Sequence, residues 1–199
     1  MNLREDYYKT FLELLDNEQE GRDFRIRRKV RNSGILIMAP HGGNIEGCTS
    51  EVAEEIAGSK HSFYSFDGLK SDADNWNLHI TSIRYDETSA LSMIADARIV
   101  ITVHGFLQTK NCVVLGGLHR SLIAGISEKL RLYGFSVNPP DARIFPGDDP
   151  KNICNQGRLK KGVQIEMSTS LRDVLMADSI QLKLFSRAVS DALESLILF

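Results

Sequence analysis

The sequence has little cysteine, almost no excess charge of either sign and no long apolar run, and each shortage excludes a class of protein. Only three cysteines occur in 199 residues. Their odd number and wide spacing suit reduced thiols better than a disulfide framework. We interpret Cys48, Cys112 and Cys154 as small apolar core residues. Because Cys48 lies near a glycine-rich motif, it is also a rival metal ligand.

The basic and acidic residues nearly cancel, with 24 Lys and Arg against 26 Asp and Glu and a net charge of −2. Without a basic field over the whole chain, general nucleic-acid binding is not expected. No apolar run approaches the length of a membrane span, and the charged N-terminus does not resemble a signal peptide. We therefore expect cytoplasmic synthesis and no membrane partner.

No composition shift or linker divides the chain, so we predict a single domain over residues 1–199. Apolar periodicity alternates between strand-like and helix-like segments, which predicts an α/β fold with a central sheet flanked by helices. Strands are predicted at residues 23–31, 34–39, 61–66, 78–82, 98–105, 113–115, 135–137 and 162–168. Helices are predicted at residues 3–15, 48–57, 88–95, 118–132 and 177–198.

A glycine-rich motif follows the predicted strand at residues 34–39. The strand is expected to break at Pro40 into a loop that carries His41 and Glu46, and a helix with Thr49 or Ser50 as its N-cap follows. In open α/β sheets, the loops at the carboxyl ends of strands surround the ligand-binding crevice. The motif lacks the Lys-Ser/Thr of a phosphate-binding P-loop, so a metal site is favoured over a phosphate site.

A second His-Gly pair, at His104, ends the apolar strand predicted at residues 98–105. If the two strands are neighbours, His41, Glu46 and His104 reach the same edge of the sheet. Three protein ligands from His and carboxylate side chains are typical of a catalytic zinc site. Taken singly, His104 is equally consistent with a hydrogen-bonded core histidine, and Glu46 with an acid at a helix N-terminus.

Two later segments also carry candidate residues. Residues 151–161 combine amide side chains with Arg158, Lys160 and Lys161, which makes this segment the best candidate for an anion pocket in a slightly acidic chain. In the strand predicted at residues 162–168, Glu166 alternates with apolar neighbours and is expected to point toward the cleft. A buried carboxylate is costly unless it is paired or functional, so the alternative for Glu166 is a structural acid in a salt bridge with Arg172.

Five motifs in this order resemble the phage-type poly-γ-glutamate hydrolase family: residues 39–49, 78–82, 103–105, 152–155 and 163–168. The resemblance covers about residues 34–171 and implies a mixed α/β sheet like that of the zinc carboxypeptidases. It also implies a zinc ion bound by His41, Glu46 and His104, and cleavage of γ-glutamyl amide bonds in poly-γ-glutamate. The carboxypeptidase analogy assigns the general base to Glu166.

The same resemblance suggests further roles. The free α-carboxylates of the polymer need cationic and amide partners, for which Arg158, Asn152 and Asn155 are candidates. Arg120, His119 or the glycine-rich backbone would stabilise the oxyanion. His79 is interpreted as a rival ligand, as an acid, or as a residue that hydrogen-bonds to a ligand.

Two alternatives stay open from the sequence. One is an amidohydrolase of small N-acyl amino acids, and the other is a non-catalytic anion-binding protein. The hydrolase is expected to act as a monomer, and outside the cell only after lysis or another export route.

Overall fold

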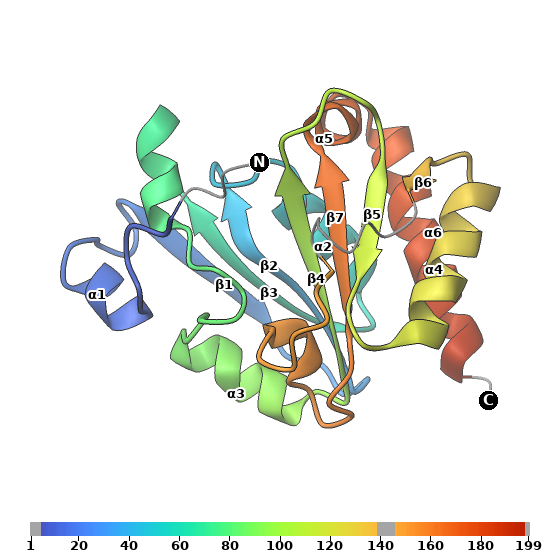
Figure 1. The fold of residues 1–199 in the computed structure, drawn as a ribbon, viewed down its shortest axis with the longest axis horizontal. Coiled ribbons are helices and arrows are strands. Elements are labelled where there is room, and N and C mark those ends of the chain that lie inside the picture. The colour runs from blue at the N-terminus through green and yellow to red at the C-terminus, as the bar shows by residue number, and fades with distance from the viewer. Residues whose placement is uncertain (1–4, 139–145, 198–199) are drawn as a thin grey trace.

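The structure is a computed structural model that describes residues 5–138 and 146–197. One α/β domain contains a seven-stranded sheet in the order β1-β3-β2-β4-β7-β5-β6 (Figure 1). The strands are β1 (Phe24–Lys29), β2 (Ile35–Gly43), β3 (Ser62–Gly68), β4 (Ile99–Phe106), β5 (Val113–Gly116), β6 (Val137–Asn138) and β7 (Val163–Ser168). The helices are α1 (Phe11–Leu15), α2 (Thr49–Ala57), α3 (Thr88–Asp96), α4 (Arg120–Leu132), α5 (Thr169–Ala177) and α6 (Ser179–Ile197), with 3₁₀ helices η1 (Asp72–Leu78) and η2 (Ile153–Asn155).

The centre of the sheet is parallel and its flanks are antiparallel. Strands β3, β2, β4 and β7 run in one direction, whereas β1 pairs antiparallel with β3 and β5 antiparallel with β7. The carboxyl ends of β2, β4 and β7 therefore meet at one edge of the sheet, at the top of Figure 1. The predicted mixed sheet flanked by helices is confirmed.

Each face of the sheet has its own hydrophobic core. Alternate residues of β2 and β4, such as Ile37 and Ile101, pack with α2, α4, α5 and α6. The residues between them, such as Met38 and Val100, pack with α1, η1 and α3. Because side chains alternate across a strand, Thr102 and His104 lie on the α3 side of β4. All three cysteines are buried and free, as predicted.

Most predicted elements are present, and the exceptions have identifiable causes. The strand predicted to end before Pro40 continues to Gly43, and its pairing with β3 shifts between Ala39 and Gly42. The prediction of a strand at residues 78–82 is wrong, because this segment does not pair with any strand of the sheet. Its backbone groups contact side chains from other segments instead. The carbonyl of Ile80, for example, lies 2.8 Å from Nε2 of His41.

The two chain ends also differ from the sequence-based expectations. Of the N-terminal helix predicted at residues 3–15, only Phe11–Leu15 is helical among the described residues. The segment before it is held by tertiary contacts, since Asp6 binds the backbone N–H of Thr81. The helix α5 was not predicted, and Ser168 caps it by accepting a hydrogen bond from the N–H of Leu171. None of the helices in the described part of the chain is long and apolar enough to cross a membrane.

Candidate metal centre

Three ligand side chains meet at the carboxyl edge of the sheet. His41 comes from the irregular end of β2, Glu46 from the loop between β2 and α2, and His104 from β4. One ligand atom from each residue lies within 4.8 Å of the others, and all three residues are buried. The structure thus brings together the three residues that the sequence analysis selected.

The lone pairs of these side chains converge on one point. Nδ1 of His41 lies 3.3 Å from Oε1 of Glu46 and 3.2 Å from Nδ1 of His104. The other ring nitrogens face away: Nε2 of His41 lies 2.8 Å from the carbonyl of Ile80, and Nε2 of His104 lies 3.4 Å from Oγ of Ser82. The carbonyl can only accept, so Nε2 of His41 carries the proton and its Nδ1 is free to bind a metal when the ring is neutral.

Burial and mutual charge set the protonation of the three ligands. Burial alone would raise the pKa of Glu46, but the His41 charge and hydrogen bonds from both histidines hold it below its ordinary value. Burial lowers the pKa of His104, which favours the neutral imidazole. Burial also disfavours charge on His41, but Glu46 outweighs this effect and raises the pKa of that ring. A carboxylate against two imidazoles is a donor set that suits zinc.

The loop that carries Glu46 is fixed from both sides. The backbone N–H of Gly105 donates to Oε2 of Glu46 at 2.8 Å, and the N–H of Glu46 donates to the carbonyl of His41 at 2.9 Å. Cys48 follows with φ of 74°, which turns the chain into α2. Its side chain lies in the core on the α2 side and is not among the ligand atoms that group with His41, so Cys48 is not part of the triad.

Glu166 lies next to the triad, directly across from His104 in the pairing of β4 with β7. Its Oε1 accepts a hydrogen bond from Nε2 of Gln164 at 2.9 Å, and Oε1 of Gln164 accepts one from Nδ2 of Asn152 at 2.8 Å. Burial, together with the charge of Glu46, raises the pKa of Glu166 well above its ordinary value. This chain of amides orients the Glu166 carboxyl group, and its raised pKa makes it a stronger proton acceptor than an exposed glutamate.

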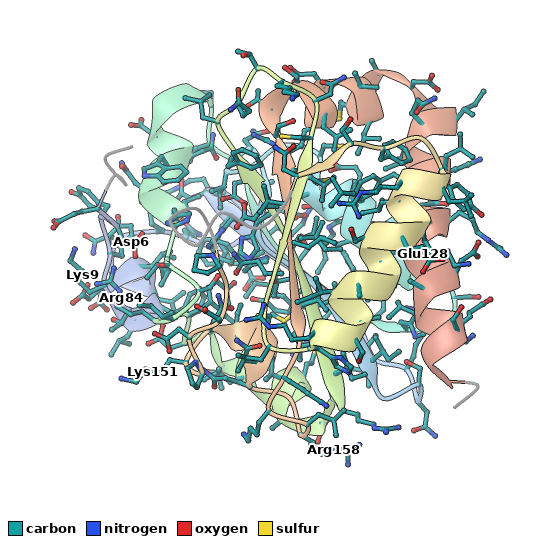
Figure 2. All side chains as sticks on the ribbon, turned by 45° about the vertical axis from the view of Figure 1, so that its right-hand side comes forward. Asp6, Lys9, Arg84, Glu128, Lys151 and Arg158 are labelled. Atoms are coloured by element: carbon teal, nitrogen blue, oxygen red, sulfur yellow. The ribbon has the colours of Figure 1, made fainter. Side chains whose placement is uncertain are left out.

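His79 packs on the triad without joining it. Its ring centroid lies 4.0 Å from that of His41, and the indole of Trp76 stacks on its other side at 4.4 Å. Nδ1 of His79 lies 2.7 Å from Oδ1 of Asp6, and Oδ2 of Asp6 accepts from Arg84 at 2.5 Å. Figure 2 shows Asp6 and Arg84 side by side, away from the sheet. His79 therefore packs against the ring of His41 and contacts Asp6 through its Nδ1, not one of the three grouped residues.

Replacement of Asp6 by Asn is expected to lower the free energy of unfolding by about 1–2 kcal/mol at pH 7. Burial opposes ionisation of Asp6, but the bonds from His79, Thr81 and Arg84 lower its pKa from 3.8 to about 2. A lowered carboxyl pKa stabilises the fold above pH 4, and this stabilisation is lost as the pH falls toward 2. Urea unfolding at pH 7 and pH 3 should show the gap between wild type and variant shrinking.

The control for this experiment is the exposed Asp173→Asn, whose effect should stay within about 0.5 kcal/mol at either pH. If the difference in the free energy of unfolding between wild type and Asp6→Asn were as large at pH 3 as at pH 7, the lowered pKa of Asp6 would not be its cause.

Several predicted substrate residues lie at the opposite edge of the sheet. The N–H of Arg158 donates to the carbonyl of Ala97, just before β4 begins, and Figure 2 shows Arg158 at the lower edge. The N–H of His119 donates to the carbonyl of Gly162, four residues and about 13 Å along β7 from Glu166. Arg120 begins α4 beside it and is exposed. Because β5 runs antiparallel to β7, its carboxyl end delivers both residues away from the triad.

The side chains of the two asparagines predicted to bind substrate already form hydrogen bonds with other groups of the protein. Asn155 donates to the carbonyls of Gly147 and Asp149 and accepts from the N–H groups of Leu118 and Gly162. These four bonds fill the hydrogen-bonding capacity of its side-chain amide. Asn152 caps η2 and donates to Gln164. Asn155 thus fixes the loops, whereas Asn152 reaches the metal centre through Gln164.

Arg172 is the cation near the triad that the sequence analysis considered only as a salt-bridge partner of Glu166. Its Nη1 donates to the carbonyl of Gly47 at 2.9 Å, and its charge acts to lower the pKa of Glu166. A Cβ at position 105 would lie 2.5 Å from its Nε, so Gly105 is needed for this close approach. Position 172 lies in the unpredicted helix α5, which explains why sequence alone did not place it at the site.

Comparison with known proteins agrees with the geometry. Residues 8–195 match the family described as poly-gamma-glutamate hydrolase. The protein YndL of Bacillus subtilis is 41% identical over 86% of this chain and 67% of its own length. The prophage-derived protein YoqZ of Bacillus subtilis is 37% identical over 85% of this chain, which spans only 61% of that relative.

Two solved structures share the fold over nearly their whole length. A bacteriophage poly-gamma-glutamate hydrolase superposes with a TM-score of 0.91 at 27% identity and covers 97% of this chain and 99% of its own. YndL, in a form described as apo and zinc-free, superposes with a TM-score of 0.90 at 36% identity over 96% of this chain and 98% of its own. By its sequence and its fold, the chain belongs to the poly-γ-glutamate hydrolase family of enzymes.

Proposed function

We propose that this protein is a zinc-dependent hydrolase of the γ-glutamyl amide bonds of poly-γ-glutamate. The observation that carries the proposal is the buried triad of His41, Glu46 and His104 with Glu166 directly beside it. The existence of a zinc-free form of YndL supports zinc as the metal. Three nitrogen and oxygen ligands also leave a fourth tetrahedral position open, as in catalytic zinc sites.

Different residues of the chain would carry out different steps of amide hydrolysis. When bound, zinc supplies Lewis acidity that lowers the pKa of water toward 7 and polarises a carbonyl group. Glu166 accepts a proton from the attacking water and returns it to the leaving amine as the C–N bond breaks. Gln164 holds Oε1 of Glu166 in place, which leaves Oε2 to face the reacting groups. The products are a carboxylate and a free amine.

We further propose that Arg172 supplies positive charge at this site. It contacts Gly105 and Gly47, each next to a triad ligand, and its buried Nε–H has no hydrogen-bond partner in the described part of the chain. A guanidinium there is placed to attract an α-carboxylate of the polymer. In this role at the metal centre Arg172 takes the place of Arg158, which lies at the other edge of the sheet.

The test is the size distribution of purified poly-γ-glutamate after incubation with protein of known metal content. We expect about one zinc per chain and shortened polymer, with activity lost after chelation and restored by added zinc. Zinc without polymer cleavage, together with hydrolysis of small N-acyl amino acids, would favour the amidohydrolase. Polymer binding with neither zinc nor cleavage would favour the anion-binding protein.

A further inference from the structure

At the edge of the sheet opposite the metal centre, three arginines line one cavity. Arg28 lies next to the last residue of β1, Arg31 lies in the connection to β2, and Arg158 comes from the loop after η2. The cavity has a volume of about 720 Å³ and is closed on one side by α3. The single acidic residue among its lining residues is Asp96. An excess of positive charge therefore collects here in a chain whose net charge is −2.

The arginines of this cavity differ from the other basic residues of β1. Arg25, Arg27 and Lys29 form ion pairs with Asp67 or Glu54 on the α2 side of the strand. Arg28 points to the other face, because side chains alternate along a strand. In the part of the chain that the structure describes, no carboxylate pairs with Arg28, Arg31 or Arg158. Ion pairs thus neutralise the basic residues on the α2 side of β1, whereas the arginines that line the cavity keep their positive charge.

The backbone beneath these side chains is fixed. Nη1 of Arg31 donates to the carbonyl of His61 at 2.6 Å, and its backbone N–H donates to Oγ of Ser62 at 2.9 Å. The N–H of Arg158 donates to the carbonyl of Ala97 at 2.8 Å. The side chains of Arg28 and Arg158 are exposed, although the backbone that carries them is fixed. A rigid base with free guanidinium groups reduces the cost of ordering when an anion binds.

We infer that this cavity, which we call the arginine cavity, is a second binding site for carboxylate groups of the polymer chain. The inference rests on the proposed substrate, a polyanion with one α-carboxylate per residue. Ile35 lines the cavity and His41 lies six residues further along β2, about 20 Å away. Both sites lie at edges of the α3 side of the sheet, so a long chain held at the metal centre can reach the cavity, whereas a short oligomer cannot. The cavity selects long polymer and takes no part in the chemistry.

The experiment compares wild type with the double variant Arg28→Gln/Arg158→Gln, which removes two exposed charges and spares the structural bonds of Arg31. The control is Lys129→Gln/Lys183→Gln, which removes two charges from the α4 and α6 side of the molecule. Binding of fluorescently labelled long poly-γ-glutamate and of a γ-glutamyl trimer is measured with zinc-loaded protein at low and moderate salt. In this assay all three proteins also carry Glu166→Gln, so that bound polymer is not cleaved, and cleavage is measured separately with the proteins that keep Glu166.

We expect the Kd for long polymer to rise about 5- to 20-fold in the arginine variant and less than 2-fold in the control. The ratio of polymer affinity to trimer affinity should fall toward one, and the salt dependence of polymer binding should weaken. Equal polymer affinity in both double variants would overturn the inference, as would failure of wild-type protein to bind polymer. Because binding is measured apart from cleavage, tight polymer binding without cleavage refutes the proposed reaction and leaves the cavity supported.

Discussion

Substitution of Glu166 by Gln is expected to lower the rate of poly-γ-glutamate cleavage about 100- to 10,000-fold while the zinc content stays that of wild type. Gln keeps the size of the side chain and its place beside His104, but it cannot take a proton from water. Glu166 is not one of the three grouped ligands, so its neutralisation leaves the donor set intact. The rate is measured from released amino groups and the zinc content by elemental analysis.

Glu128→Gln is the matched control for Glu166→Gln, because Glu128 is an exposed acid on α4 (Figure 2). It should retain wild-type activity and zinc content. Loss of zinc from Glu166→Gln would make Glu166 a ligand instead of a base. Undiminished cleavage would show that another group carries the proton.

Replacement of His41 by Ala is expected to weaken zinc binding by more than about 100-fold and to abolish polymer cleavage. The change removes one of three ligands and leaves Glu46 and His104 with an incomplete set. It also leaves the carbonyl of Ile80 without its 2.8 Å contact, so circular dichroism must confirm that the variant is folded. Zinc affinity is measured by competition with a chelating dye.

The control for the ligand variant is His61→Ala. His61 is also a buried histidine, but its ring contacts Oγ of Ser33 near the start of β2 and lies outside the triad. That variant should bind zinc as wild type does, whatever its effect on stability. If His41→Ala retained zinc with wild-type affinity, the triad would not be the metal site.

The metal centre could be predicted from sequence because its parts are local signals placed by a general rule. Two apolar strands that each run into His-Gly identify His41 and His104, and parallel neighbours bring their carboxyl ends together. Glu46 lies five residues after His41, within the same loop. The alternation of strand 163–168 placed Glu166 on the face opposite Ile165 and Met167, and the two cores confirm this division.

The predicted substrate residues depended on strand direction, which periodicity does not reveal. The apolar run of β5 reads the same in either direction, so the helix that starts at Arg120 was expected near the triad. Antiparallel pairing with β7 puts it at the opposite edge. Arg158 was recognised as a candidate anion contact, but its place was set by backbone hydrogen bonds to the segment before β4.

Sequence by itself determined the α/β class and the family of this protein. It also determined the two motifs that supply the metal ligands, each an apolar strand that runs into a His-Gly pair. Apolar periodicity and short motifs are both encoded by neighbouring residues, so they can be read without the fold. Only the tertiary structure decided which residues surround those ligands. Arg172 reaches Gly47 from a helix 125 positions away in sequence, and His79 reaches Asp6 from 73 positions away. Such contacts depend on how helices and loops pack on the sheet, and no local pattern specifies that packing.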